Sequence, residues 1–265
     1  MIRDDWETLA NSWTSLIRPE GTLHHRFILN PCIDELLEPI SGFTILDAGC
    51  GEGYLARKLA FKGAKIIGID FSTLMIEKCK EAIPQQLASQ LEYYCADIRQ
   101  MPFLADDSVD KILANLCFPN LETSAVREAL AEFQRVLRST GCLVFSILHP
   151  CFEAGLGGWE PGEKNSSGRR EGKFFKADHY FLERSYEQLW KNPEGPFPQP
   201  LAFVHRTLET YFALLTDASF SVDLLREPKP IGSALKKYGK WFEKETRVPF
   251  FLVFRCKPQS ERATK

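Results

Sequence analysis

The sequence lacks several features that would place it in a membrane, secreted or nucleic-acid-binding class. No apolar run reaches the roughly 20 residues that a membrane-spanning helix needs, and the opening residues, MIRDDWE, contain no apolar segment typical of a signal peptide. The net charge is −2, with no long basic block. This balance argues against a nucleic-acid partner bound mainly through its phosphates. We therefore expect a cytoplasmic protein that neither spans a membrane nor is secreted by a standard signal.

The eight cysteines lack the spacing of a disulfide framework or a metal site. They include no C-x-x-C pair and no Cys/His cluster, so no metal is predicted. Cys95, Cys142 and Cys256 lie in apolar strand-like runs, where a thiol behaves as a small hydrophobic side chain. Such cysteine usage fits a reducing cytosol. With 265 residues, the chain can bury one good core and carry a substantial appendage.

What the sequence does contain is a strand, a glycine turn and a helix start between residues 43 and 55. The apolar run F-T-I-L ends at Asp47, and Gly49, Gly51 and Gly53 follow at alternate positions. Glycine suits such a turn because it tolerates positive φ and lets a ligand approach the backbone. The helix start offers free N–H donors to a carboxylate or phosphate. The pattern is typical of a nucleotide-binding βαβ unit, and a tight loop without a ligand is the alternative.

Two further strand-like runs also end in aspartate. Residues 64–69 precede Asp70, which lies about twenty residues past the glycines, where a dinucleotide fold places the carboxylate that binds ribose hydroxyls. Residues 91–96 precede Asp97. Three consecutive strands that end in aspartate predict one wall of a polar crevice shaped for a nucleoside.

These segments resemble the class I S-adenosylmethionine-dependent methyltransferases, in particular the small-molecule subgroup like the ubiquinone/menaquinone methyltransferases. The matching segments are ILDAGCGEG at 45–53, GIDFSTLM at 68–75, CADI at 95–98 and DKILAN at 110–115. The spacing D-x-G-x-G-x-G differs from the G-x-G-x-x-G of NAD-binding folds, because a cofactor without a pyrophosphate has less need of that spacing. The resemblance implies S-adenosyl-L-methionine as cofactor and methyl transfer to an oxygen, nitrogen or carbon nucleophile of a small-molecule acceptor.

Strand and helix runs alternate from residue 43 to 150, which predicts an α/β fold with a parallel sheet covered on both faces. The resemblance implies a doubly wound seven-stranded sheet in the order 3-2-1-4-5-7-6, with the last strand antiparallel. We divide the chain into a helical cap (1–40), a Rossmann-like core (41–150), a substrate-cap insertion (151–198), a C-terminal completion of the sheet (199–257) and a tail (258–265).

Two segments outside the core carry further expectations. Residues 154–173 are rich in glycine and polar residues, which predicts a flexible loop, and residues 174–189 concentrate aromatic side chains. We interpret the insertion as a cap over the substrate, with a mobile surface insertion as the alternative. Residues 233–246 are predicted to form a charged helix.

The resemblance also implies a role for each residue of the cofactor site. Asp47 orders the glycine turn near the methionine amine, and Asp70 accepts hydrogen bonds from both ribose hydroxyls. Arg26 pairs with the methionine carboxylate. The other implied contacts are the Gly49, Cys50 and Gly51 backbone at the amino-acid part, Phe71 and Met75 beside the adenine, Asp97 and Ile98 at its edge, Asn115 and Leu116 below the sulfonium, and Trp13.

The acceptor side is less determined by the sequence. N-L-C-F at 115–118 replaces the [D/N]-P-P-[Y/F] tetrapeptide of exocyclic amino methyltransferases, which disfavours that reaction. His149 and His205 are candidate general bases, although a structural role is as good an explanation for each. Two other functions stay open: an RNA or protein methyltransferase of the same fold, and a non-catalytic S-adenosylmethionine-binding protein. The sequence assigns no oligomeric state.

Overall fold

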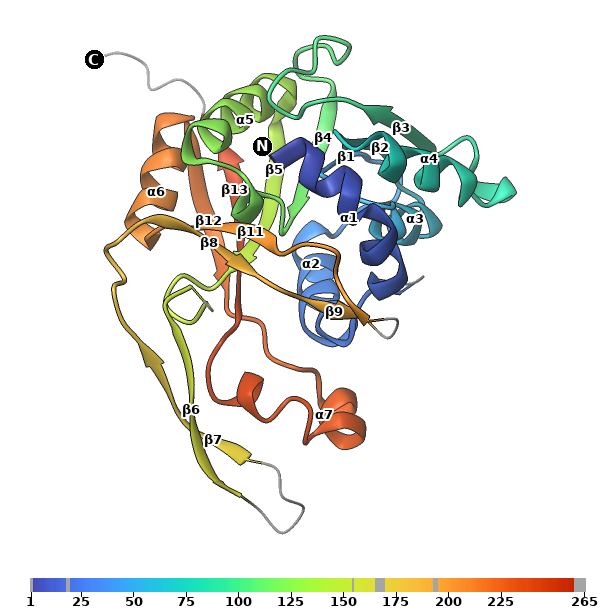
Figure 1. Ribbon diagram of the computed structural model, residues 1–265. Helices are drawn as coiled ribbons and strands as arrows, with labels where there is room; N and C mark the ends of the chain where they lie inside the picture. Colours follow the sequence, from blue (N-terminus) through green and yellow to red (C-terminus); the bar gives the residue numbers. More distant parts are fainter. Residues whose placement is uncertain (1, 18–19, 154, 165–169, 193–194, 260–265) are drawn as a thin grey trace, which may run out of the picture.

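The structure is a computed structural model that describes residues 2–17, 20–153, 155–164, 170–192 and 195–259. Its centre is a seven-stranded sheet in the order β3-β2-β1-β4-β5-β13-β12 (Figure 1). The strands are β1 (Thr44–Ala48), β2 (Lys65–Asp70), β3 (Leu91–Cys95), β4 (Val109–Asn115), β5 (Leu137–Leu148), β12 (Phe220–Arg226) and β13 (Phe251–Pro258). β13 pairs antiparallel with both β5 and β12, whereas β1 to β5 pair in parallel. The predicted strand order, with its antiparallel last strand, is confirmed.

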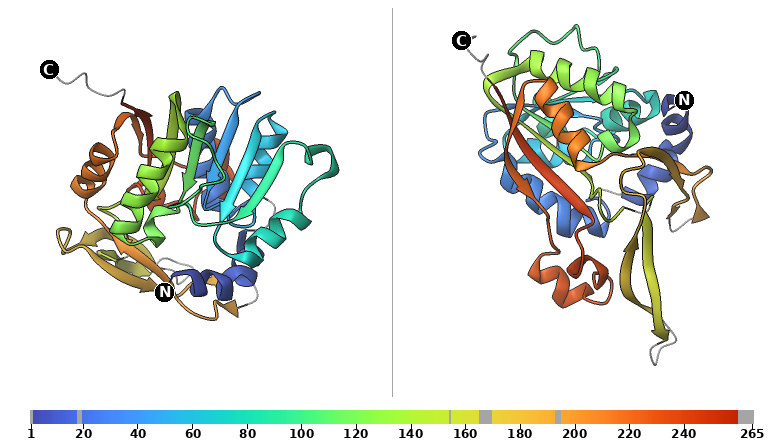
Figure 2. Two further views of the ribbon diagram at one scale, coloured as in Figure 1. Left: turned by 90° about the horizontal axis from the view of Figure 1, so that it is seen from above. Right: turned by 90° about the vertical axis from the view of Figure 1, so that its left-hand side faces the viewer.

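Helices cover both faces of the sheet because its central strands are apolar on both sides (Figure 2). One core contains Ile33, Leu59 and Ile76, and the other contains Val126, Phe133 and Leu214. The helices are α1 (Ile2–Ile17), α2 (Asn30–Leu37), α3 (Tyr54–Phe61), α4 (Thr73–Glu81), α5 (Thr123–Val136), α6 (Leu208–Asp217) and α7 (Gly232–Tyr238), and the short π-helical segment η1 (His25–Leu29) precedes α2.

Parallel strands place their carboxyl ends at one edge of the sheet. Helix α1 lies over this edge, where its Glu7 carboxylate accepts hydrogen bonds from Ser72 Oγ at 2.6 Å and Leu74 N at 3.3 Å. Ser72 in turn caps α4, since its Oγ accepts from Met75 N at 3.2 Å. The N-terminal helix is thereby attached to the segment that follows β2.

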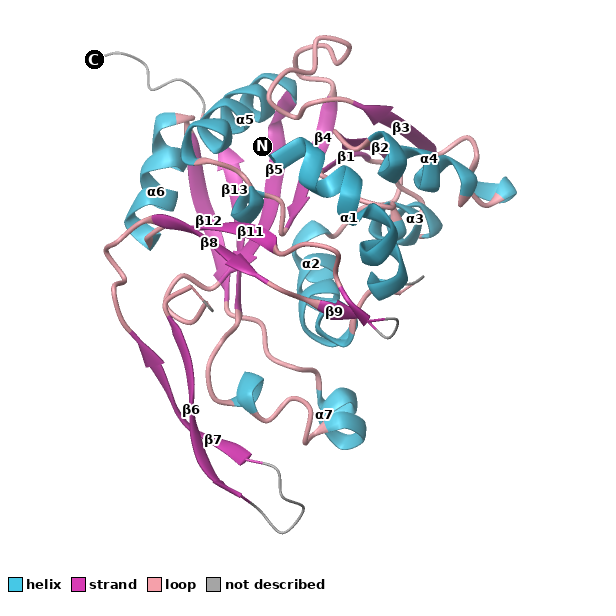
Figure 3. Cartoon of the chain, viewed as in Figure 1, coloured by secondary structure: helices cyan, strands magenta, loops and turns pink. Residues whose placement is uncertain are grey.

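The insertion contains strands of its own, outside the main sheet (Figure 3). Its strands are β6 (Gly157–Lys164), β7 (Arg170–Ala177), β8 (Arg184–Gln188), β9 (Lys191–Asn192) and β10 (Gly195–Pro196), and β11 (Leu201–His205) follows it. β6 pairs antiparallel with β7, and β8 with β11. β11 lies at the start of the segment 199–257 that was expected to complete the sheet, but it does not join the seven-stranded sheet.

Two expectations about these outer segments are wrong over the described residues. The loop predicted for residues 154–173 instead contributes strands to the β6–β7 pair. Across this pair the Trp159 and Phe175 rings pack edge to face at 5.9 Å, and the Arg247 guanidinium lies 4.4 Å from the Trp159 ring. The helix predicted for 233–246 ends at Tyr238, just before Gly239, a poor helix former. A short 3₁₀ segment, η4 (Lys244–Thr246), follows.

None of the helices in the described ranges is long and apolar enough to cross a membrane. All eight cysteines lie within those ranges, and all are free thiols.

Candidate active site

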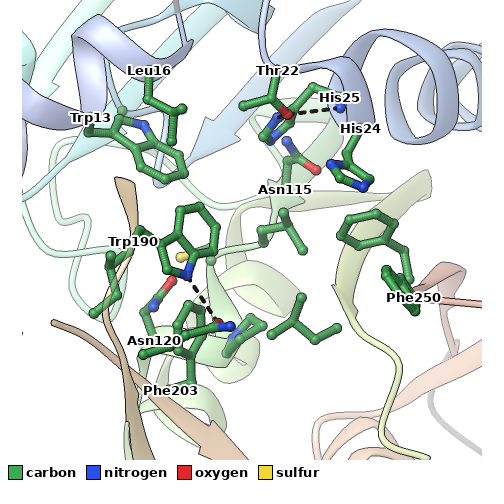
Figure 4. A pocket seen from close by; sticks show the side chains of 18 of the residues that line it. Trp13, Leu16, Thr22, His24, His25, Asn115, Asn120, Trp190, Phe203 and Phe250 are labelled. Carbon is green, nitrogen blue, oxygen red and sulfur yellow. Dashed lines mark hydrogen bonds between the residues drawn. The ribbon is translucent and has the colours of Figure 1, made fainter. Parts of the chain in front are cut away.

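A cavity of about 810 Å³ opens at the carboxyl edge of the sheet, between the strand ends, α1 and the β8–β11 pair (Figure 4). This volume lies in the range of about 300–1,000 Å³ that is usual for small-molecule sites. Its lining includes these predicted cofactor residues: Trp13, Asp47, Gly49, Cys50, Gly51, Asp70, Phe71, Met75, Asn115 and Leu116. Residues from three strand ends and from α1 are therefore brought to one space.

The glycine turn after β1 has the backbone conformation that its composition predicts. Gly49, Gly51 and Gly53 have φ angles of 73°, 55° and 79°. Residues other than glycine rarely adopt such positive φ angles. The amides of Gly49 and Cys50 donate to the Ile69 carbonyl at 2.8 and 3.0 Å, so the turn is fixed to the end of β2. A Cβ atom at Gly49 would lie only 2.8 Å from Cys117 Sγ. The turn therefore has no room for a side chain at its first glycine.

Buried carboxylates make this half of the cavity negative. Asp70 accepts from Gly51 N through Oδ2 at 3.0 Å and from Ser72 N through Oδ1 at 2.9 Å. Burial raises the pKa of Asp70 to about 6, against the opposing effect of these two amides. Burial, with Asp70 and Glu52 nearby, raises the pKa of Asp47 to about 7. Oδ2 of Asp47 is buried and has no hydrogen-bond partner among the described residues.

These groups fit S-adenosylmethionine, which carries a sulfonium, an ammonium group and two ribose hydroxyls. Each oxygen of Asp70 takes one amide hydrogen and keeps a lone pair for a hydroxyl. The unpartnered, buried oxygen of Asp47 suits a nearby cation, which would stabilise the charged carboxylate. Asp47 and Asp70 would therefore hold the amine and the ribose of the cofactor.

Three predicted cofactor residues do not line the cavity. The Asp97 carboxylate, 44% exposed, pairs with Arg99 Nη2 at 2.6 Å. Ile98 packs in the core on the α5 face of the sheet. The Arg26 guanidinium pairs with Glu20 at 2.7 Å. The structure therefore brings none of the three to the cavity wall.

The predicted bases His149 and His205 are buried and do not line the cavity either. In His149, Nδ1 accepts from Cys151 N at 3.1 Å and Nε2 contacts Glu227 Oε1 at 3.0 Å. In His205, Nδ1 contacts the Glu153 carboxylate and Nε2 contacts the Tyr180 carbonyl at 2.8 Å. Both rings use both nitrogens within the protein, so neither offers a free lone pair to an acceptor.

His205 acts instead as a partner for a carboxylate that does line the cavity. Burial lowers the pKa of His205, but the hydrogen bonds to Glu153 and to the Tyr180 carbonyl raise it more, so the pKa lies above its ordinary value. A ring that donates hydrogen bonds both to the Glu153 carboxylate and to the Tyr180 carbonyl carries a hydrogen on each nitrogen, so it is protonated. Glu153 also accepts from Tyr186 Oη at 3.1 Å. This carboxylate is thus held in place by two neighbours at the cavity wall.

The other half of the cavity is mostly aromatic, and the sequence did not identify most of it. Its rings are those of Phe152, Trp159, Phe175, Trp190, Phe203, Trp241, Phe250 and Phe251. Polar side chains among them include His24, Asn120, Glu153 and Glu245. Of these eight rings, only Phe175 lies in the aromatic-rich segment 174–189 that the sequence analysis identified. The other rings come from segments far apart in the sequence.

The end of β4 is strained where the two halves meet. Leu116 has a φ of 52°, which is unusual for a non-glycine residue. Its amide donates to Ser146 Oγ at 2.9 Å, and Ser146 Oγ donates to Asn115 Oδ1 at 2.7 Å. Such conformations persist only where surrounding contacts determine them, and they cluster at active sites.

Among the residues that the structure describes, no group of three or more His, Cys, Asp or Glu side chains is arranged to hold a metal ion.

Known proteins resemble the chain in both sequence and fold. A family model described as a methyltransferase domain matches residues 45–141. A Haemophilus influenzae protein whose name states no function is 29% identical over 210 residues, which are 77% of each chain. The malonyl-[acyl-carrier protein] O-methyltransferase of Yersinia pestis is 33% identical over 142 residues, which are 52% of this chain and 47% of that protein. The chain thus aligns with about half of that relative.

A solved S-adenosylmethionine-dependent methyltransferase from Mesorhizobium loti has the same fold. Its TM-score is 0.68 at 23% identity, and the match covers 91% of this chain and 100% of the other. The domain match spans the segment from β1 into β5, which supplies the glycine turn and the buried carboxylates. The chain therefore contains a segment, residues 45–141, that matches a methyltransferase domain, and it has the fold of S-adenosylmethionine-dependent methyltransferases.

Proposed function

We propose that the enzyme methylates an oxygen or nitrogen nucleophile of a small, largely apolar acceptor. One observation carries this proposal: ten of the thirteen predicted cofactor residues and the aromatic side chains line one continuous cavity. A non-catalytic cofactor-binding protein would need no such space. An acceptor that packs against the Trp190 and Phe203 rings would lie beside the cofactor.

The chain's own contribution to the reaction is position and exclusion of water. When bound, the cofactor supplies a methyl group activated by the positive sulfur. Asp47 and Asp70 would hold its polar parts, and Asn115 and Leu116 would form the floor beneath the sulfur. Helix α1 brings Trp6 and Trp13 over the cavity, where the rings keep water away from the reacting atoms. Good orientation alone can lower the barrier by several kcal/mol.

The names of several relatives favour a second candidate, methylation of a malonyl group on an acyl-carrier protein. The charge of the acceptor half argues against it. Glu153 and Glu245 lie in the wall, and Lys191 is the one Lys or Arg side chain that the described residues contribute to the lining. A malonyl carboxylate would find no cation there among the described residues besides Lys191, since His205 and His24 are already paired with these two glutamates. The ubiquinone-like subgroup is supported by the aromatic walls, whereas the relatives' names do not favour it.

The test is release of S-adenosylhomocysteine with three sets of acceptors: substituted phenols, aromatic amines and a malonyl thioester on an acyl-carrier protein. We expect turnover with a phenol or an amine. Turnover with the malonyl thioester alone would establish the second candidate instead. If calorimetry detects cofactor binding and an acceptor screen widened to RNA and protein detects no product, the chain is a cofactor-binding protein without this activity.

A further inference from the structure

The five histidines of the chain all lie in the described ranges, and they differ in what their ring nitrogens contact. His149 and His205 use both nitrogens and do not line the cavity. His179 is exposed and also lies outside the lining. His25 lines it, but burial and the neighbouring His24 lower its pKa to about 4, so it is a weak base. The remaining ring is that of His24.

His24 has the surroundings that a base requires. Its side chain is 30% exposed and lines the cavity. Its Nε2 lies 2.7 Å from Glu245 Oε1 in η4, and no described residue makes a hydrogen bond with Nδ1. Phe242 and Phe251 pack edge-on against the ring at 5.8 and 6.0 Å. The imidazole is therefore held by one carboxylate and two apolar walls, with one nitrogen left for a ligand.

Glu245 determines which nitrogen is left. A carboxylate accepts but cannot donate, so it selects the tautomer with hydrogen on Nε2 and leaves the lone pair on Nδ1. The Glu245 side chain is only 7% exposed, and its Oε2 has no hydrogen-bond partner in the part of the chain that the structure describes. A buried carboxylate of this kind stabilises the imidazolium that forms when the ring accepts a proton. Nucleophile-activating bases are held in the same way by a third group.

The position of His24 places it beside the reacting centre. In Figure 4 the His24 and His25 rings and the Asn115 carboxamide lie on the same side of the cavity, across from Trp190 and Phe203. Asn115 ends β4, where the cofactor's sulfur is predicted to lie. An acceptor seated on the aromatic side would then have the methyl group and the His24 ring within one small space.

We propose that His24 is the general base of methyl transfer and that Glu245 is its positioning residue. This inference rests on the proposed function, since it requires an acceptor with an O–H or N–H group. The acceptor's oxygen or nitrogen bonds to the methyl carbon while the bond between that carbon and sulfur breaks, and its electrons stay on sulfur. The acceptor's proton passes to Nδ1 of His24 and then to solvent. The titratable groups that face His24 are Glu245 and its neighbour His25.

The first experiment needs no acceptor. Nitrogen-15 NMR of histidine-labelled protein with S-adenosylhomocysteine bound reports the tautomer of each ring, and H24Q assigns the His24 signal. We expect neutral His24 to carry hydrogen on Nε2, and E245Q to shift the ring toward a tautomer mixture. A neutral ring with hydrogen on Nδ1, or no response to E245Q, would overturn the proposal whether or not an acceptor is known.

The second experiment compares a weakly acidic phenol, 4-methylphenol, with 4-nitrophenol, which ionises unaided near neutral pH. H24Q should lower kcat for 4-methylphenol by about 10²–10⁴-fold and lower it much less for 4-nitrophenol, with unchanged affinity for the cofactor. H179Q, at an exposed ring outside the cavity, is the matched control and should behave as wild type. Equal turnover of wild type and H24Q with both phenols refutes the base. If the wild type methylates neither phenol and no aromatic amine, the proposed acceptor class fails, and the NMR result still tests the tautomer of His24 on which the proposal rests.

Discussion

The two halves of the cavity are built in different ways. The cofactor half consists of the turns that follow β1, β2 and β4, so hydrogen bonds within one sheet fix its backbone. The acceptor half collects side chains from segments as far apart as His24, Glu153 and Glu245. Its geometry depends on contacts between these segments. A sheet edge can therefore keep one cofactor in place while the segments around the acceptor vary.

Buried charge is also handled differently in the two halves. In the acceptor half each carboxylate has a histidine partner, His205 for Glu153 and His24 for Glu245. In the cofactor half Asp47 has no cationic partner among the described residues, and its pKa is raised to about 7. An unpaired buried carboxylate is costly unless a cation approaches it. The cofactor half is thus arranged for a cation that the ligand brings, whereas in the acceptor half the protein supplies a histidine partner for Glu153 and for Glu245.

The largest expected effect on stability follows substitution of Arg206, whose side chain connects the end of β11 to the segment that follows β4. Its buried guanidinium extends from the end of β11 and donates to the carbonyls of Phe118 and Leu121 and to Thr123 Oγ1 at 2.8 Å. Arg206→Met removes these three hydrogen bonds, although the Phe118 carbonyl still accepts from Leu121 N at 3.1 Å, so we expect the free energy of unfolding to fall by about 3 kcal/mol. Urea denaturation measures this free energy of unfolding. Arg127→Met, at an exposed arginine paired with Asp217, is the control and should change stability by less than about 1 kcal/mol.

Gly49→Ala should damage the cofactor half alone. The new Cβ would meet Cys117 Sγ at 2.8 Å in a backbone with φ of 73°. Such strain costs about 1–3 kcal/mol, and the displaced turn should weaken cofactor binding by tenfold or more. Gly51→Ala is the matched comparison, because its Cβ has no neighbour closer than 3.7 Å. Calorimetric titration with S-adenosylmethionine distinguishes them, and equal losses would show that φ matters and the contact does not.

The sequence could indicate the glycine turn and the strand end of the cofactor half because their determinants are local. The turn and the strand that ends at Asp70 are each contained in a few consecutive residues. Right-handed crossovers then bring the strand ends together. The strand order of the sheet came from the family resemblance, whereas the alternation of strands and helices predicted only a parallel sheet covered on both faces.

The acceptor half could not be predicted because its contacts join distant segments. His24 and Glu245 are separated by 221 positions, and nothing near either residue indicates the pairing. His149 and His205 were candidate bases because both could project toward the edge where the cofactor binds, yet tertiary contacts occupy both rings. The segment 154–173 looked like a loop because its composition is polar. The Trp159 and Phe175 pair that packs across β6 and β7 was not apparent from single residues.

Asp70→Ala tests the ribose contact in the cofactor half. Loss of hydrogen bonds to a charged acceptor should weaken S-adenosylmethionine binding by about 1–3 kcal/mol. Asp97→Ala is the control, because its carboxylate pairs with Arg99 outside the cavity lining. In the same calorimetric titration we expect the Asp97→Ala variant to bind S-adenosylmethionine with the affinity of the wild type. A loss at Asp97 equal to that at Asp70 would mean that Asp97 leaves Arg99 and contacts the adenine, as the sequence suggested.

The smallest expected effect is a pH dependence confined to the cofactor half. Because folding raises the pKa of Asp47 to about 7, the unliganded protein loses stability as pH rises from about 4, the ordinary value, through about 7. A bound cation favours the charged carboxylate, so S-adenosylmethionine should bind more tightly as pH rises toward 7, by no more than about tenfold per pH unit.

His205 gives the contrast in the acceptor half. Its raised pKa contributes stability that is complete below about pH 6.5, the ordinary value, and is lost as pH rises through the folded pKa. The cofactor does not reach this ring, so binding should leave that contribution unchanged. Calorimetry at pH 6.5 in buffers of different ionisation enthalpy measures protons released on binding. Release that Asp47→Asn removes and His205→Gln retains would assign the coupling to the cofactor half, whereas the reverse would mean that the two halves share one electrostatic response.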